Sequence, residues 1–262
     1  MDILVDGEPV FAATGGQVFD PARPSIVFVH GAGMDHTVWA LQTRYFAYHG
    51  RNVLAVDLPG HGRSAGQPLP AIDRMADWLA HLLDAAGIDK AAIVGHSMGA
   101  LVALEAAVRH ETRVSAVALL AISAAMPVSL PLLAASEADN HSAFDMINIW
   151  SHSHGAQIGG NRAPGLWMTG QTLRLLERTE PGVLYIDLKA CNDFTFDLTM
   201  ADGVTCPALL VLGERDAMTP PRGAAELRTA IPNAETVMLE GCGHMMMTER
   251  PDKVLDALTT IV

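Results

Sequence analysis

Three motifs along this 262-residue chain contain the side chains that nucleophilic acyl transfer needs. Ser97 stands between two glycines in residues 95–99, which read Gly-His-Ser-Met-Gly. Asp216 and His244 follow later, each in a glycine-containing loop. A serine hydroxyl is a weak nucleophile at neutral pH, so it needs an adjacent base, and that base needs an orienting acid. The chain supplies all three types in the order serine, aspartate, histidine.

The elements around Ser97 predict a sharp turn. Residues 91–94 form a short apolar run typical of a buried strand, and residues 100–107 are strong helix formers. Ser97 would lie on the turn between them, which requires almost no side chain at the flanking glycines and holds the serine in a strained, exposed conformation. Such a turn presents a nucleophile.

The rest of the chain alternates strand and helix patterns. The Asp6-Gly7 pair predicts a hairpin between two opening strands. Short, fully apolar strands that alternate with helices predict an α/β fold, with a mostly parallel sheet covered on both faces. The further strands are expected at residues 25–29, 52–56, 114–120, 207–212 and 235–239, and the helices at residues 37–49, 72–86, 221–230 and 251–262.

This alternation of strand and helix patterns stops in the middle of the chain. Between about residues 124 and 198, proline, histidine, methionine and tryptophan are scattered through weak helical segments. We therefore expect one large α/β domain built from residues 1–123 and 199–262, with residues 124–198 inserted as a helical cap. Asp216 and His244 each follow a predicted strand, so they are expected at the carboxyl edge of the sheet, where open parallel sheets bind ligands.

Five motifs in this order resemble the α/β-hydrolase-fold serine hydrolases. They lie at residues 30–33, 57–64, 95–99, 213–220 and 241–244, so the resemblance covers nearly the whole chain outside the cap. It implies that Ser97 is the nucleophile, that His244 is the general base and then acid, and that Asp216 orients His244. It also implies an oxyanion hole formed by the backbone N–H groups of Met98 and Ala32, with Gly33 as the neighbouring alternative to Ala32.

Other polar residues compete for these roles. Glu214 could replace Asp216 as the acid, although the family spacing favours Asp216. His30 and His96 flank the motifs and are interpreted as supporting residues, and Asp57 as a structural hydrogen-bonding residue. The histidines of the cap lack the ligand pattern of a metal site, so no metal is expected; they are His141, His152 and His154. The expected substrate pocket contains Gly31, Trp150, Trp167 and Met146.

Composition limits the classes of partner. The net charge of −12 disfavours nucleic acid and anionic membrane surfaces, so a small-molecule substrate is expected. The glycines of residues 60–66 do not have dinucleotide-binding spacing and no phosphate-binding loop is evident, so no cofactor is expected. The acidic N-terminal residues do not fit a signal peptide, and three cysteines fit reduced packing residues, which favours a cytoplasmic enzyme.

The leading hypothesis is an esterase that cleaves a small carboxylic ester, lactone or thioester through an acyl-enzyme on Ser97. Carbon–carbon bond hydrolysis of the meta-cleavage type and perhydrolysis are alternatives, because relatives perform both with the same residues. A small-molecule receptor is an alternative of another class, since some proteins of this fold use the site to sense a ligand.

Overall fold

The computed structural model describes residues 1–160, 162–232 and 234–262, and in this part of the chain one eight-stranded sheet forms the centre. The strand order is β1-β2-β4-β3-β5-β6-β7-β8. β1 and β2 form the predicted hairpin, β2 pairs antiparallel with β4, and all later pairs are parallel. The strands are β1 (Asp2–Val5), β2 (Glu8–Ala13), β3 (Ser25–Val29), β4 (Asn52–Val56), β5 (Ala91–His96), β6 (Val114–Leu120), β7 (Ala208–Gly213) and β8 (Glu235–Leu239).

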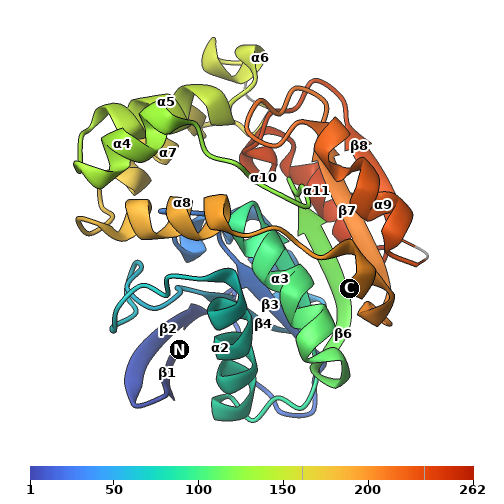
Figure 1. Cartoon of the computed structure of the whole chain (residues 1–262). Coiled ribbons are helices and arrows are strands. Elements are labelled where there is room, and N and C mark those ends of the chain that lie inside the picture. Colours follow the sequence, from blue (N-terminus) through green and yellow to red (C-terminus); the bar gives the residue numbers. More distant parts are fainter. Residues whose placement is uncertain (161, 233) are drawn as a thin grey trace.

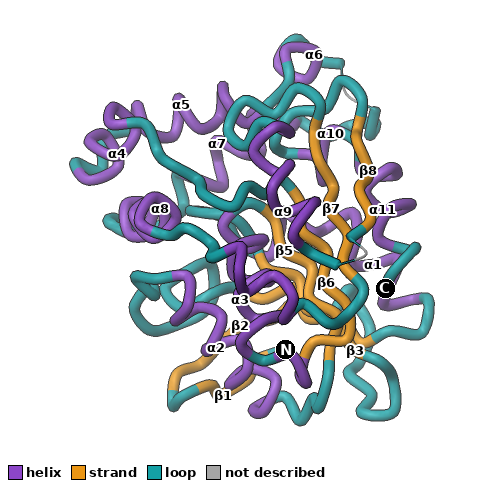
Figure 2. Tube along the Cα trace, turned by 45° about the vertical axis from the view of Figure 1, so that its right-hand side comes forward, coloured by secondary structure: helices purple, strands orange, loops and turns teal. Residues whose placement is uncertain are grey.

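Helices cover both faces of this sheet, as the apolar strands predicted (Figures 1 and 2). One face carries α2 (Ile72–Ala85), α3 (Met98–Arg109) and α9 (Ala225–Ala230), and the other carries α1 (Ala40–Tyr48) and α11 (Pro251–Leu258). Side chains alternate between the two faces along each strand. On β3, for example, Val27 and Val29 join one hydrophobic cluster whereas Ile26 and Phe28 join the other. Every residue of β3, β4, β5 and β7 is buried.

The segment between β6 and β7 supplies a separate group of helices, which we call the cap helices. They are α4 (Leu130–Glu137), α5 (Ser142–Ser151), α6 (His154–Gln157), α7 (Met168–Leu176) and α8 (Val183–Asp193). Figure 1 shows them above the sheet, on the side where β6 ends. An isolated bridge between Ala125 and Thr195 joins the two ends of the segment. The helices and this bridge lie within residues 124–198, the interval expected to form a cap, of which residue 161 lies outside the described residues.

Several helices are shorter than predicted. The helix expected at residues 37–49 begins as a 3-10 turn, η1 (His36–Trp39), and that expected at residues 221–230 begins as η4 (Pro221–Ala224). The last helix ends at Leu258, and α10 (Met246–Glu249), directly after His244, was not predicted. Two further 3-10 turns, η2 (Glu111–Arg113) and η3 (Leu198–Gly203), precede β6 and β7. Among the described residues, no helix has the length and apolar character that a bilayer span requires.

Candidate active site

Ser97 occupies the turn between β5 and α3. Its φ of 55° and ψ of −118° lie in a region that residues other than glycine rarely adopt. The flanking glycines are required by space: a Cβ on Gly95 would lie 2.0 Å from the carbonyl oxygen of Gly99, and a Cβ on Gly99 would lie 2.3 Å from that of Val29. The close approach of β3, β5 and α3 therefore sets both the sequence of this motif and the strained backbone of Ser97.

Asp216 and His244 meet across the ends of β7 and β8. The Nδ1 atom of His244 lies 2.8 Å from Oδ2 of Asp216, and both side chains are buried. The carboxylate also accepts hydrogen bonds from the backbone N–H groups of Met218 and Thr219 and from the Thr219 hydroxyl. Burial alone would raise the pKa of Asp216, but the charge and hydrogen bond of His244 and the Thr219 donors outweigh it and lower the pKa. Asp216 is thus an ionised, fixed acceptor for His244.

Glu214, the alternative acid, lies elsewhere. Its Oε2 accepts a hydrogen bond from the backbone N–H of Gly241 at 2.8 Å, and its side chain is exposed. The structure therefore brings Asp216 and not Glu214 into contact with His244. Thr219, which sequence reasoning did not select, completes the shell of donors around the carboxylate. The sequence spacing indicates this contact, because a threonine three residues after an aspartate commonly donates a hydrogen bond to that side chain.

His96 and His30 are buried neutral residues that support the loops. His96 donates from Nε2 to the backbone carbonyl of His244 at 3.0 Å. Burial first, and then the proximity of His244, lower the pKa of His96 to about 3. His30 donates from Nδ1 to the carbonyl of Gly31 and accepts at Nε2 from the N–H of Leu58. Burial and His61 lower its pKa to about 4, so both rings stay uncharged near neutral pH.

Ser97 and His244 open onto one cavity of about 200 Å³. Its lining is mostly apolar and comes from the loops after β3, β6 and β7 and from α4, α5 and α8. Among the described residues, the lining includes no aspartate, glutamate, lysine or arginine. Besides Ser97 and His244 it comprises Gly31, Ala32, Met34, His96, Met126, Pro127, Val128, Ser129, Leu132, Ile147, Trp150, Ser151, Leu188, Cys191, Ala217, Met218 and Thr219. The cavity therefore suits a small, uncharged group.

Two of the four predicted pocket residues line this cavity and two do not. Gly31 and Trp150 are part of the lining. Trp167 is 69% exposed, because its ring folds against Gly170 in the first turn of its own helix, α7. Met146 is half-buried against the hydrophobic cluster that contains Ile26 and Phe28, while its neighbour Ile147 contributes to the cavity lining. The weak helical pattern of this segment did not indicate which side of each helix faces the body of the protein.

The residues predicted to supply the oxyanion donors lie near Ser97. Met98 is the first residue of α3, and Ala32 lines the cavity in the loop after β3. Gly33, the alternative donor, already gives its backbone N–H to the carboxylate of Asp187 at 2.8 Å. The N–H of Ala32 is thus the better candidate of the two.

The cap histidines do not form a cluster. His141 is exposed and contacts Asp145 and Glu177, whereas His152 is buried and contacts the carbonyl of Asn148. In the described part of the chain, the group whose atoms come close enough to hold a metal ion consists of Asp35, His36 and Asp57. This group is distinct from the three predicted histidines and lies outside the cavity lining.

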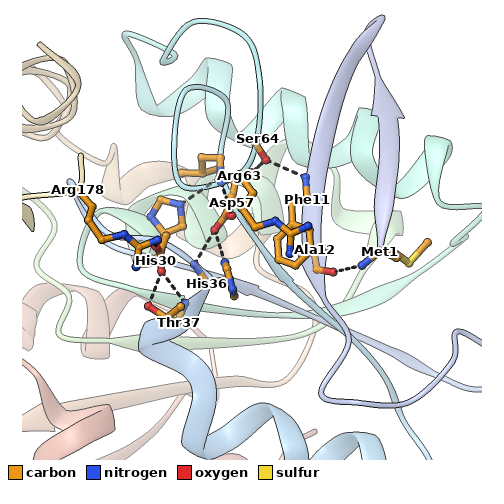
Figure 3. A network of polar contacts seen from close by, with 12 residues as sticks. Met1, Phe11, Ala12, His30, His36, Thr37, Asp57, Arg63, Ser64 and Arg178 are labelled. Carbon is orange, nitrogen blue, oxygen red and sulfur yellow. Dashed lines mark hydrogen bonds and ion pairs between the residues drawn. The ribbon is translucent and has the colours of Figure 1, made fainter. Parts of the chain in front are cut away.

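Asp57 already has donors on both oxygens (Figure 3). Oδ1 accepts from the backbone N–H and the ring Nδ1 of His36, and Oδ2 accepts from the backbone N–H of Arg63. Burial would raise the pKa of Asp57, but these hydrogen bonds outweigh it and lower the pKa. An ion would have to displace these donors. Asp57 therefore joins the loops after β3 and β4, in line with its predicted structural role.

Comparison with known proteins agrees with this architecture. A model of the alpha/beta hydrolase family matches residues 26–257. The chain belongs to this family. It is 29% identical over 248 residues to a pimeloyl-[acyl-carrier protein] methyl ester esterase of Aromatoleum aromaticum, covering 88% of this chain and 94% of that protein. It is 30% identical over 236 residues to a putative carbamate hydrolase of Pseudomonas savastanoi, covering 84% and 86%.

Solved structures of the family superpose over almost the full length. The enol-lactonase from Burkholderia xenovorans aligns with a TM-score of 0.89 at 24% identity, covering 100% of this chain and 99% of that one, which shows a shared fold. A thermophilic esterase aligns with a TM-score of 0.82 at 26% identity, covering 99% and 95%. These four proteins carry the names of different hydrolases, so the comparison supports hydrolase activity and does not identify the substrate.

Proposed function

We propose that this alpha/beta hydrolase is a serine esterase that cleaves small, uncharged carboxylic esters through an acyl-enzyme on Ser97. The observation that carries the proposal is the hydrogen bond between Asp216 and His244, placed where His244 and the strained Ser97 line one cavity. With Nδ1 of His244 engaged by Asp216, Nε2 is the nitrogen left to act on the Ser97 hydroxyl.

The reaction has two halves. Ser97 Oγ attacks the ester carbonyl while its proton passes to His244 Nε2, and the carbonyl oxygen becomes an oxyanion that the N–H groups of Ala32 and Met98 stabilise. Breaking the bond to the alcohol leaves the acyl group on Ser97, and His244 returns the proton to the departing alkoxide. Water then attacks the acyl-enzyme with His244 again as base, which releases the acid and restores Ser97.

The cavity supports a size and polarity limit on the substrate. A cavity of about 150 Å³ holds benzene, so about 200 Å³ accommodates on the order of eight to ten non-hydrogen atoms. Burying a free carboxylate or ammonium without a partner is costly, and none of the described lining side chains has a fixed charge that could pair with one. Short aliphatic or monocyclic acyl groups, including small lactones, fit these limits.

A panel of chromogenic esters with acyl chains of two to ten carbons tests the proposal, run beside Ser97→Ala and with a serine-directed phosphonate. We expect turnover to be greatest for short chains, to disappear in Ser97→Ala, and to stop on labelling of Ser97. Undiminished turnover in Ser97→Ala would rule out the mechanism. Phosphonate labelling without ester turnover would favour carbon–carbon hydrolysis or perhydrolysis at the same residues, and absence of both would favour the receptor alternative.

A further inference from the structure

Two side chains of the cap segment form hydrogen bonds with the backbone of Gly33, the residue after Ala32. The N–H of Gly33 donates to Oδ2 of Asp187 at 2.8 Å, and the carbonyl of Gly33 accepts from the hydroxyl of Thr179 at 2.8 Å. Asp187 lies on α8 and Thr179 in the connection between α7 and α8, so both come from the cap segment. Figure 1 shows α8 below the other cap helices, on the side of the sheet.

Two leucines of the cap helices pack closely against Gly33. Its φ of +63° is in the left-handed region, and a Cβ there would lie 2.9 Å from Leu184 of α8. Leu176 of α7 lies 3.3 Å from the same point. The loop after β3 is therefore enclosed by the cap through packing as well as through both of the backbone hydrogen bonds of Gly33.

Asp187 is held in turn by a buried histidine. His61 Nε2 lies 2.8 Å from the same Oδ2, and His61 Nδ1 lies 3.0 Å from the carbonyl of Pro59. Both partners only accept hydrogen bonds, so both ring nitrogens carry hydrogen and His61 is an imidazolium paired with the Asp187 carboxylate. Burial would lower the pKa of His61, but the charge and hydrogen bond of Asp187 outweigh it and raise the pKa.

We propose that Asp187 and Thr179 are positioning residues for the oxyanion hole: by holding Gly33 at both ends, they fix the orientation of the adjoining Ala32 peptide. This inference rests on the proposed esterase function. It assigns the cap a second task besides lining the cavity. An oxyanion donor is effective only when it is fixed before the charge develops. A small displacement of the donor therefore lowers the rate of the chemical step more than it weakens binding of the substrate.

Asp187→Ala, Asp187→Asn and Thr179→Val test this assignment. Alanine removes the acceptor of the Gly33 N–H, asparagine keeps one carbonyl oxygen for it, and valine removes only the Thr179 hydroxyl at nearly constant shape. We expect kcat to fall on the order of ten- to a hundredfold in Asp187→Ala and less in the other two, with KM within about threefold of the wild-type value. Glu177→Gln is the matched control, because Glu177 is a cap carboxylate that contacts exposed cap residues, His141 and Arg174.

A second measurement distinguishes a role in positioning the oxyanion hole from a role that only holds the cap against the body of the protein. A short alkyl trifluoromethyl ketone forms an adduct with the serine that bears an oxyanion, so its inhibition constant should rise in step with the fall in kcat/KM across the three variants. Unchanged kcat and inhibition constant in folded Asp187→Asn and Thr179→Val would overturn the assignment, even if their melting temperatures fall. A raised KM at constant kcat would overturn it too, by showing that these residues shape the cavity.

Measuring Ser97→Ala in the same series distinguishes a failure of the positioning inference from a failure of the esterase proposal. If Ser97→Ala is inactive while the Asp187 and Thr179 variants keep wild-type kcat, the positioning inference is wrong and the esterase proposal stands. If Ser97→Ala retains turnover, both are wrong.

Discussion

His244 Nδ1 lies 2.8 Å from Oδ2 of Asp216, and the same oxygen accepts a hydrogen bond from the Thr219 hydroxyl. The contact fixes the tautomer of His244, since Nδ1 must carry the hydrogen that points to the carboxylate. In the proposed mechanism, Nε2 is then the nitrogen that accepts the proton of Ser97. A carboxylate in this position would also stabilise the imidazolium that this mechanism forms.

Asp216→Asn should therefore reduce kcat on the order of 10⁴-fold while KM changes little. The amide keeps the size of the side chain, but when its NH₂ group faces His244 the ring takes the wrong tautomer. Steady-state kinetics on a short-chain ester measure the effect. Glu214→Gln is the control, since Glu214 contacts Gly241 and not His244. A Glu214→Gln loss as large as that of Asp216→Asn would contradict this division of roles.

Much of this site could be predicted because its residues stand at the ends of strands. Strands β3, β4, β6 and β8 have the predicted bounds. For β3, β4 and β6 the reason is that largely apolar runs between turn residues have few other structures open to them. The contact between Asp216 and His244 follows from that topology: β7 and β8 are parallel neighbours, so the loops after them share one edge of the sheet.

The cap could not be predicted to the same depth. Its helices are short and their apolar residues are not confined to one side, so the sequence did not distinguish Ile147, which lines the cavity, from Met146, which does not. The contact between Asp187 and Gly33 could not be predicted for a related reason. A single aspartate on a helix carries no signal in the sequence, and Gly33 lies 154 residues earlier.

The glycines around Ser97 give a prediction about stability. Gly95→Ala and Gly99→Ala place a Cβ within 2.0 Å and 2.3 Å of backbone carbonyl oxygens, which cannot move without separating β3, β5 and α3. We expect each to lower the free energy of unfolding by about 3 kcal/mol or more. Gly155→Ala is the control, because the nearest atom to its Cβ would be the Ser153 hydroxyl at 3.9 Å. Equal melting temperatures for all three variants would refute the packing argument.

The buried neutral histidines predict acid sensitivity. The pKa values of His96 and His30, about 3 and about 4 in the folded protein, lie below the ordinary value of 6.5. Because the folded-state pKa is lowered, their contribution to stability is complete above pH 6.5 and is lost as the pH falls toward the folded-state values. Between pH 7 and pH 5 the pair should reduce the free energy of unfolding by about 4 kcal/mol.

Denaturant titrations at several pH values measure this loss. His96→Gln, which cannot titrate, should have a pH dependence smaller by about 2 kcal/mol over the same interval. An unchanged slope in His96→Gln would show that other groups cause the acid sensitivity.

A second buried acidic side chain, that of Glu249, links the cap to the loop that contains His244. Glu249 accepts hydrogen bonds from the N–H and hydroxyl of Ser153, in the cap, and from the N–H of Gly243, next to His244. Glu249→Gln replaces one accepting oxygen with a donor, which leaves at least one buried donor without a partner at a cost of about 1–3 kcal/mol. We expect a lower melting temperature and, because Gly243 is adjacent to the base, a kcat reduced by roughly three- to tenfold.

The exposed neighbour Glu240, in the same loop, provides the control for Glu249. Glu240→Gln should change neither the melting temperature nor kcat, whereas Ser153→Ala, which removes one of the three donors, should give an intermediate loss of stability. If Glu249→Gln melts at a lower temperature but keeps the wild-type kcat, Glu249 fastens the cap without positioning His244. In that case the cap would influence the chemical step through Asp187 and the proposed oxyanion hole, and not through Glu249.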